Sequence, residues 1–301
     1  MSVSSRKVSK VVIPVAGLGS RFLPATKALP KELLPIVDKP IIHHIVREAA
    51  LAGIETVVFV TSRPKISIED YFDPGDLTAL KLEQANKEHL IEETLLLSRQ
   101  IDIVSVRQYQ PLGLGHAILQ AKPVVDGQPF AVILGDDIVR VKEGSATAIQ
   151  QCLAGFSSVD SGSVVGVLQV PKDQVNLYGV AAFKNKSPEQ NGLEEILSFV
   201  EKPPIDKAPS NWALPGRYVF EPGIIECLEK TKPGSGGEIQ LTDGMQLLLK
   251  TQPFFGKALV GERFDTGSKL GYLMANVAYA LEDKNHKEDL RAYLKTLLAN
   301  T

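Results

Sequence analysis

The sequence is poor in cysteine, in excess charge of one sign and in long apolar runs, and each shortage excludes a class of protein. Its two cysteines, Cys152 and Cys227, lie in unrelated contexts, which argues against a disulfide framework and a zinc site. No segment approaches ~20 consecutive apolar residues, so no transmembrane helix is expected. The polar, basic residues 1–10 lack the apolar stretch of a signal peptide. We therefore expect a cytoplasmic protein that does not contact membranes.

The net charge of −2 argues against the general basic surface with which proteins bind nucleic acid. Any anion that binds to this chain must therefore bind in a local pocket. The chain has 301 residues, of which 44% are hydrophobic and 23% are charged, an ordinary globular composition. This length is enough for one large domain or two modest ones.

The first 170 residues alternate between strand-like apolar runs and helical patterns. Such βαβ alternation predicts an α/β fold with a Rossmann-like, mostly parallel sheet flanked by helices. Ligands bind such a sheet beyond the carboxyl ends of its strands. The expected strands cover 10–16, 56–61, 102–109, 130–134 and 162–170, and the expected helices cover 41–52, 77–99 (with a possible break), 114–121 and 145–155.

The pattern changes after residue 170, where strands are separated by polar, proline-rich loops. We expect strands over 180–183, 194–200 and 213–220, forming an antiparallel extension of the same sheet. Helices are expected over 242–250, 269–281 and 284–299, the last of them suited to a dimer contact or to packing as a lid. No low-complexity linker divides the chain.

A glycine-rich turn, Gly17-Leu18-Gly19, follows the first apolar run. Bare backbone N–H groups in such a turn can approach a phosphate closely. Arg21 and Lys31 add two positive charges to this turn, so we expect it to bind a polyanion. The dinucleotide fingerprint fails because Phe22 stands where its third glycine belongs, and no Gly-Lys-Ser/Thr completes a Walker motif. A surface loop with solvated charges is the plainer alternative.

Carboxylates follow two other strand-like runs. Asp136 and Asp137 come after the run 130–134 and Gly135, and Asp265 follows a short strand-like run. Carboxylates near a phosphate site are suited to hold Mg²⁺, which also keeps substrate oxygens and water as ligands. On local grounds, Asp265 could equally be the N-cap of the next helix, and Asp137 could support the metal or cap the next segment.

Three further segments carry polar groups at strand ends. Gln108 can donate and accept hydrogen bonds, as reading a uracil edge requires, and Gly113 lets backbone approach a ring. Glu201 can accept hydrogen bonds from sugar hydroxyls, and Lys202 can neutralise a sugar phosphate. Solvated strand ends and an exposed turn are the alternatives. His116 falls in the first turn of a helix, and we do not assign it as a catalyst.

Residues 17–35, with the run Ala-Thr-Lys-Ala-Leu-Pro-Lys-Glu-Leu-Leu-Pro, resemble the signature of the sugar-1-phosphate nucleotidylyltransferases, in the form of the bacterial uridylyl members. The resemblance continues through 37–40 and to Lys269. It implies a single nucleotidyltransferase domain over 1–301, with a nucleotide part over about 8–170, a sugar-phosphate part over about 171–268 and C-terminal helices over about 269–301. It also implies UTP and glucose 1-phosphate as substrates, Mg²⁺ as cofactor, and a homodimer or homotetramer.

The same resemblance assigns roles to individual residues. It implies that the glycine loop, Gly19 included, wraps the triphosphate and that Arg21 and Lys31 are the phosphate-binding, catalytic cations. The remaining assignments are Ala16, Gly17, Glu32, Gln108 and Gly113 for the nucleotide, Gly179, Glu201 and Lys202 for the sugar phosphate (Lys202 also as catalytic), and Asp136 with Asp265 for the metal.

Other functions remain open at this point. The nearest is a thymidylyltransferase or another sugar-1-phosphate nucleotidylyltransferase, and Gly135 favours it slightly, because uridylyl members more often carry proline there. A non-catalytic regulatory paralogue would be expected to lose the loop arginine or a metal aspartate, which this chain keeps. The missing third glycine counts against a nicotinamide oxidoreductase.

Overall fold

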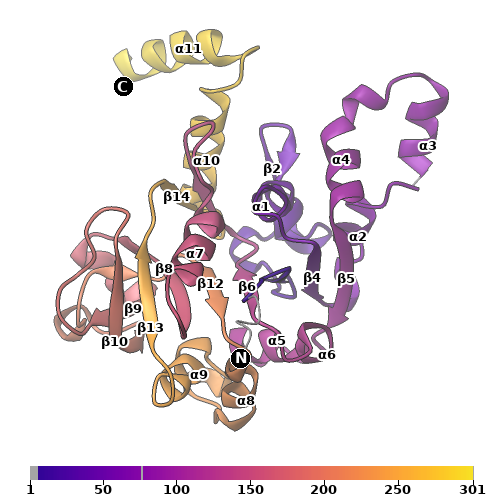
Figure 1. The fold of residues 1–301 in the computed structure, drawn as a ribbon. Helices are drawn as coiled ribbons and strands as arrows, with labels where there is room; N and C mark the ends of the chain where they lie inside the picture. Colours follow the sequence, from indigo (N-terminus) through magenta and orange to yellow (C-terminus); the bar gives the residue numbers. More distant parts are fainter. Residues whose placement is uncertain (1–5, 76, 301) are drawn as a thin grey trace.

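A ten-stranded mixed sheet forms the centre of the molecule (Figure 1), as seen in a computed structural model that describes residues 6–75 and 77–300. Four neighbouring strands at one side are parallel, because β1 pairs with β4 and β6, and β4 pairs with β5. The strand order is β11-β9-β10-β13-β8-β12-β6-β1-β4-β5. Their bounds are β1 Lys10–Pro14, β4 Thr56–Thr61, β5 Asp102–Arg107, β6 Phe130–Ile133, β8 Ser163–Gln169, β9 Gly179–Phe183, β10 Leu193–Glu201, β11 Trp212–Ala213, β12 Arg217–Phe220 and β13 Phe254–Ala258.

Helices cover both faces of this sheet, and a separate apolar core lies on each face. Alternate side chains of β1 lie in the two cores, since Val11 and Ile13 belong to one and Val12 to the other. Helices α1 and α7 complete the first core, and α5, α8 and α9 complete the second. The helices are α1 Ile41–Leu51, α2 Ser67–Tyr71, α3 Leu77–Gln84, α4 Glu92–Gln100, α5 Leu114–Gln120, α6 Lys122–Val125, α7 Ala148–Ser157, α8 Gly223–Lys230, α9 Leu241–Leu248, α10 Lys269–Ala280 and α11 Lys287–Ala299.

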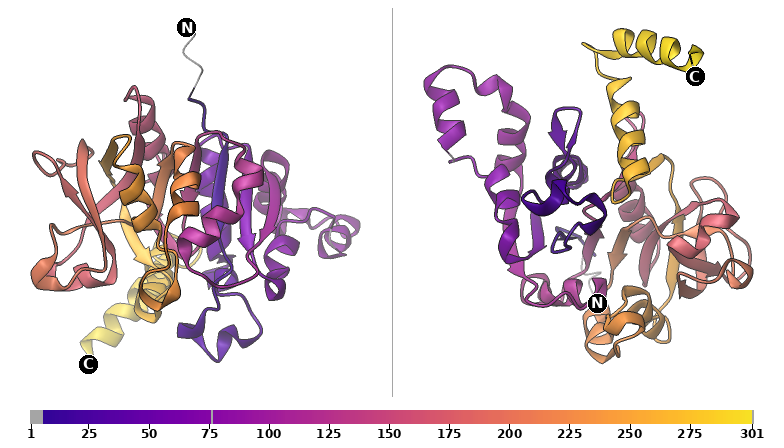
Figure 2. Two further views of the ribbon diagram at one scale, coloured as in Figure 1. Left: turned by 90° about the horizontal axis from the view of Figure 1, so that it is seen from below. Right: turned by 180° about the vertical axis from the view of Figure 1, so that it is seen from behind.

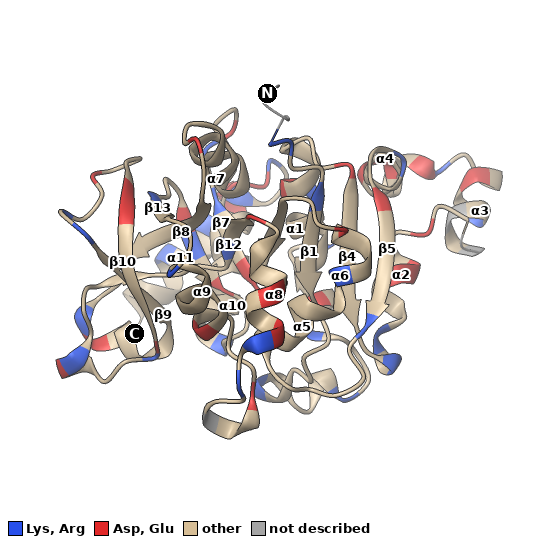
Figure 3. Cartoon of the chain, turned by 60° about the horizontal axis from the view of Figure 1, so that its bottom comes forward, with Lys and Arg blue, Asp and Glu red and all other residues tan. Residues whose placement is uncertain are grey.

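Two pairs of helices project from the body, α3 with α4 and α10 with α11 (Figure 2). No residue of α11 is buried. None of the described helices is long and apolar enough to cross a membrane. Positive and negative side chains are interspersed along the chain (Figure 3), in keeping with its small net charge.

Two short ladders lie outside the main sheet. Strand β2 (Pro35–Ile36) pairs with β3 (Lys39–Pro40) just after the loop that contains Lys31. Strand β7 (Asp137–Arg140) pairs antiparallel with β14 (Glu262–Asp265), with Asp137 opposite Asp265. This second ladder joins two segments that are distant in the sequence, and it lies directly beside the predicted metal aspartates.

The sequence predicted the parallel half and the shared sheet, and both are confirmed. The expected helix over 77–99 is broken, into α3 and α4. The prediction of one strand over 213–220 is wrong, because the chain divides there into β11 and β12. Strand β12 lies inside the main sheet, antiparallel to β6 and β8, so the sheet is parallel only in part. Strands β1 and β5 end two residues before the expected 16 and 109, since the glycine loops begin there.

Candidate active site

A cavity of about 270 Å³ opens at the carboxyl edge of the sheet, where the loops after β1 and β6 face β9 and β10. Side chains from both halves of the chain line it. The residues that the sequence singled out and that line this cavity are Arg21, Asp136, Gly179, Glu201, Lys202 and Asp265. The structure thus brings together the predicted phosphate, metal and sugar residues.

The glycine loop after β1 folds tightly over Lys31. Gly19 has a φ of 68°, and a Cβ built there would lie 3.2 Å from the Cβ of Lys31, so a larger residue would be strained. The hydroxyl of Thr26 donates to the carbonyl of Gly19 over 2.7 Å. Arg21 lies in a short 3₁₀ turn over Ser20–Phe22, and its Nη1 donates to the carbonyl of Gly267 at 3.4 Å. The first contact closes the loop on itself, and the second connects it to the segment that follows Asp265.

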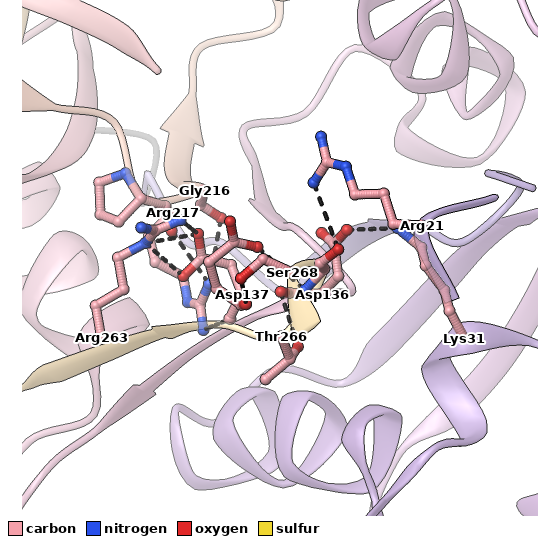
Figure 4. Close-up of polar contacts among 12 residues, drawn as sticks. Arg21, Lys31, Asp136, Asp137, Gly216, Arg217, Arg263, Thr266 and Ser268 are labelled. Atoms are coloured by element: carbon pink, nitrogen blue, oxygen red, sulfur yellow. Dashed lines mark hydrogen bonds and ion pairs between the residues drawn. The ribbon is translucent and has the colours of Figure 1, made fainter. Parts of the chain in front are cut away.

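Lys31 and Asp136 form an ion pair at the edge of this cavity (Figure 4). Burial by itself lowers the pKa of Lys31, but Asp136 and Glu32 outweigh burial and raise it. Burial alone would raise the pKa of Asp136, and the charges of Lys31 and Arg21 hold it below its ordinary value instead. Both groups are thus charged at neutral pH, one as ammonium and the other as carboxylate.

Asp136 and Asp265 point toward the same small space. A Cβ built on Gly267 would lie 2.7 Å from Oδ2 of Asp136 and 3.1 Å from Oδ1 of Asp265, so a side chain there would displace one of the two carboxylates. Within residues 6–75 and 77–300, no cluster of three or more His, Cys, Asp or Glu side chains could hold a metal by itself. Two carboxylates that leave the other positions to phosphate oxygens and water suit Mg²⁺.

Local backbone contacts hold these two aspartates in place. The hydroxyl of Thr266 donates to the carbonyl of Asp136 over 2.8 Å, and Gly267 donates its N–H to Oδ1 of Asp265 over 3.0 Å. The alternative that Asp265 caps the next helix is wrong, because Ser268 caps α10 by accepting from the N–H of Gly271. Asp265 is therefore available to a ligand.

Asp137, whose role the sequence left open, belongs to a second group of charges next to Asp136 (Figure 4). Its carboxylate accepts from Nε and Nη2 of Arg263 at 2.5–2.9 Å. Its carbonyl accepts from Nη2 of Arg217 at 2.7 Å. Arg217 is fully buried and also bonds both oxygens of Glu48, at 2.9 and 2.8 Å. Asp137 thus ties the loop that holds Asp136 to Arg217 and Arg263, and it starts β7.

The predicted sugar residues lie at the adjoining ends of β9 and β10. Gly179 is directly opposite Glu201 in the ladder, and a Cβ on Gly179 would lie 3.2 Å from Oε2 of Glu201. Thr242, in the first turn of α9, donates its hydroxyl to Glu201 over 3.1 Å. Lys202 has a φ of 41°, an uncommon conformation for a residue with a side chain, and its ammonium group is exposed.

The predicted nucleotide residues lie in the segments that follow β1 and β5. Gln108 follows β5, and its amide nitrogen lies 3.2 Å from the carbonyl oxygen of Gly113 and 3.0 Å from Nδ1 of His116. Glu32 is 1% exposed and pairs with the buried Lys65 over 2.6 Å, which joins the glycine loop to the end of β4. Ala16 accepts from Ser62 through its carbonyl at 3.4 Å, and Gly17 lies beside the Lys31 side chain.

Comparison with known proteins assigns this chain and its fold to a family. The family model described as nucleotidyl transferase matches residues 10–282. The chain belongs to the nucleotidyl transferase family. Among curated members, it is 43% identical to the UTP–glucose-1-phosphate uridylyltransferase of Bacillus subtilis, covering 97% of this chain and 98% of that one. It is 44% identical to the enzyme of the same name from Streptococcus pneumoniae, covering 96% and 95%.

Solved structures give the same result for this nucleotidyl transferase. A UDP-glucose pyrophosphorylase from Acinetobacter baumannii is 40% identical and superposes with a TM-score of 0.87, covering 97% of this chain and all of that one. A UTP-bound form from that organism is 41% identical with the same TM-score, covering 96% and 99%. A glucose-1-phosphate thymidylyltransferase from Bacillus anthracis is 23% identical with a TM-score of 0.69, which shows the shared fold alone.

Three charged residues of this nucleotidyl transferase were missed by the sequence analysis. Arg263 stands two positions before Asp265 in β14, so strand alternation places both on one face, and this signal could have found it. Lys65 and Arg217 carry no such signal, because their partners Glu32 and Glu48 are distant in the sequence.

Proposed function

We propose that this protein converts UTP and glucose 1-phosphate to UDP-glucose and pyrophosphate. The observation that carries the proposal is the convergence of Asp136 and Asp265 in a cavity that also holds Arg21, Glu201 and Lys202. Similarity of 43–44% to uridylyltransferases over nearly the whole chain supports the choice of substrates. We propose one domain over 1–301, with the nucleotide, sugar-phosphate and C-terminal parts given above.

In this reaction a phosphate oxygen of the sugar phosphate attacks the α-phosphorus of UTP in line, and pyrophosphate leaves. The nucleophile is already an anion at neutral pH, so no general base is needed. The obstacle is repulsion between two polyanions. Arg21 and Lys31 would offset it at the triphosphate, and Lys202 at the sugar phosphate. Alignment of the two substrates can contribute about 7–11 kcal/mol to lowering the barrier.

Asp136 and Asp265 would hold the divalent cation, for which we propose Mg²⁺. When bound, this ion supplies positive charge to the phosphate oxygens. Backbone groups of the glycine-containing loops, together with Glu32 and Gln108, would contact the nucleotide, and residues at the adjoining ends of β9 and β10 would contact the sugar. The proposed nucleotide residues are Ala16, Gly17, Gly19, Glu32, Gln108 and Gly113, and the proposed sugar residues are Gly179, Glu201 and Lys202.

Use of dTTP is a second activity that one residue favours. Gly135, which precedes Asp136, stands where the uridylyl members more often carry proline, and this resembles the thymidylyl relatives. Uracil and thymine differ by one methyl group, which an apolar pocket discriminates by only ~1–3 kcal/mol. We expect measurable turnover of dTTP below that of UTP.

We also propose that the protein is a homodimer or homotetramer. Helix α10 exposes Leu270, Leu273, Met274 and Val277, whose spacing places them on one face of the helix. A second copy of the chain would cover this apolar face. Light scattering during gel filtration should give a multiple of the chain mass, and Leu273→Glu should lower it. A parent protein with the mass of one chain would refute this assembly.

The cytoplasmic location stays a prediction.

Pyrophosphate release across a grid of nucleotides and sugar phosphates tests the proposed activity. With Mg²⁺ present, UTP with glucose 1-phosphate should give the highest kcat/KM. Release that is no faster with the sugar phosphate than without it would refute a sugar-nucleotide synthesis. A higher kcat/KM for dTTP, GTP or ATP than for UTP would replace the uridylyl assignment.

A further inference from the structure

Arg263 connects two sides of the cavity. Strands β7 and β14 form its proposed metal side, and the adjoining ends of β9 and β10 form its proposed sugar side. From β14, Nε and Nη2 of Arg263 donate to the Asp137 carboxylate at 2.5–2.9 Å (Figure 4). The Cζ atom of the same guanidinium group lies 4.7 Å from the centre of the Tyr178 ring, within reach of a cation–π contact, and Tyr178 immediately precedes β9. Both side chains line the cavity.

Backbone pairing holds the sugar side in the main sheet through few residues. In the part of the chain that the structure describes, β10 pairs with β13 over residues 193–195, and beyond them, from Ile196 to Glu201, it pairs with β9 alone. The ladder between β10 and β9 has a register irregularity between Ile196 and Ser198. On its other edge β9 pairs with β11 through one residue, Val180. The ends of β9 and β10 at the cavity therefore depend on side-chain contacts for their position.

Side-chain contacts reach the sugar side from two directions. From α9, the side chain of Gln246 accepts from the N–H of Phe199 over 2.9 Å. From the metal side, Arg263 reaches it through the ring of Tyr178. Among the described residues, no hydrogen bond or salt bridge joins β7 or β14 directly to β9 or β10. The contact of Arg263 with Tyr178 is therefore placed to fix the distance between the two sides.

Tyr178 in turn holds the backbone of Lys202. The N–H of Lys202 donates to the carbonyl oxygen of Tyr178 over 3.0 Å. Lys202 has a φ of 41°, and a residue with a side chain keeps such a conformation only where its surroundings hold it. Lys202 is the proposed cation for the sugar phosphate, so a movement of Tyr178 would move the group that positions the nucleophile.

We propose that Arg263 is a positioning residue, which fixes Lys202 relative to the metal side through the ring and the carbonyl group of Tyr178. This inference rests on the proposed function. The charge of Arg263 is paired with that of Asp137, so Arg263 is not one of the cations that offset the charge of the substrates. Misplacement of a reacting group by about 1 Å can cost on the order of 100-fold in rate, so a fixed distance between the two sides serves the in-line attack.

Two variants of Tyr178 test this role while Arg263 and Asp137 stay paired. Tyr178→Leu removes the ring, so it should speed hydrogen exchange of the Lys202 amide roughly fivefold or more, the factor for one cation–π contact. It should lower kcat/KM for glucose 1-phosphate by a similar factor and leave the Kd of UTP unchanged. Tyr178→Phe keeps the ring and should stay within about twofold of the parent in exchange and in kcat/KM.

Arg263→Lys tests the same contact from the metal side. Lysine keeps a charge for Asp137, but its single ammonium group cannot pair with Asp137 and lie over the ring at once. It should reproduce the losses of Tyr178→Leu, and the double variant should lose little beyond either single variant. Arg140→Lys is the matched control, because Arg140 belongs to the same ladder, pairs with Glu262 and does not line the cavity. It should leave exchange and kcat/KM unchanged.

Hydrogen exchange is followed by mass spectrometry on the free protein, with the amides of β1 as a reference for overall stability. Exchange of Lys202 that is the same in the parent and in Tyr178→Leu would overturn the proposal. Equal losses in Tyr178→Leu and Tyr178→Phe, losses that multiply in the double variant, or a parallel rise in the exchange of β1 would also overturn it. If Arg263→Lys does not fold, the two Tyr178 variants decide.

The same measurements separate this proposal from the proposed function. Exchange needs no substrate, so a parent protein that shows the expected exchange pattern but releases no pyrophosphate would refute the proposed function alone. Pyrophosphate release that depends on glucose 1-phosphate, with Lys202 exchange indifferent to Tyr178, would refute the positioning role alone.

Discussion

Replacement of Arg217 by methionine should destabilise the fold strongly, and the structure gives the size of the effect. Arg217 is fully buried, and Glu48, its partner, is 7% exposed. The substitution leaves the Glu48 carboxylate buried without its cation, which costs about 3–5 kcal/mol. It also removes the donor to the Asp137 carbonyl, which adds about 1–3 kcal/mol if no other donor replaces it. At about 2 °C per kcal/mol for a chain of this size, Tm should fall by roughly 8–16 °C.

A double variant separates the charge effect from the packing effect. Glu48→Gln combined with Arg217→Met removes the unpaired charge but keeps an oxygen for the N–H of Ile149, which Glu48 accepts over 2.9 Å. Thermal unfolding followed by circular dichroism should show that the double variant regains at least half of the lost Tm. The reasoning is refuted if the single variant loses less than about 3 °C, or if the double variant is no more stable than the single one.

Three further predictions concern catalysis and pH. Asp265→Asn should abolish pyrophosphate release while leaving Tm close to the parent value, and near-normal turnover would remove Asp265 from the metal site. Lys202→Ala should raise KM for glucose 1-phosphate or lower kcat without changing the Kd of UTP; an unchanged response to the sugar phosphate would contradict its assignment. Burial and the neighbouring His43 lower the pKa of His44 to about 3, so the unfolded chain takes up a proton below about pH 6.5 that the native protein does not. The free energy of unfolding should therefore fall by about 2 kcal/mol between pH 7 and pH 5. Urea titrations of His44→Leu should lack this part of the pH dependence, and the same pH dependence in parent and variant would refute the prediction.

The parallel half of the fold could be predicted because its signals are local. Strands β1 and β6 contain uninterrupted apolar runs, and glycine or aspartate follows them closely where the candidate site lies, as after Val11–Ile13 before the glycine loop. Strand β12 could not be predicted in this way. Its residues read as one more antiparallel strand, and its position between β6 and β8 is decided by long-range pairing that leaves no local trace.

In the candidate site, too, the sequence predicted only the residues that have a local signal. Arg21, Asp136, Glu201 and Lys202 were identified because they stand beside glycine or proline at strand ends, and they line one cavity. The residues that hold them were not identified, because each bonds a partner from a distant segment, as Arg217 does with Glu48.

The pairing of β7 with β14 has a consequence for how the chain can vary over evolution. Because the ladder sets Asp137, the neighbour of Asp136, opposite Asp265, the spacing of the proposed metal ligands Asp136 and Asp265 is decided where the strands meet and not by the length of chain between them. Residues 141–261 can therefore gain or lose segments in their loops, and sugar preference can change there, while the proposed metal site stays intact. A one-residue insertion within β14 is different, because it would turn every following side chain of the strand to the opposite face.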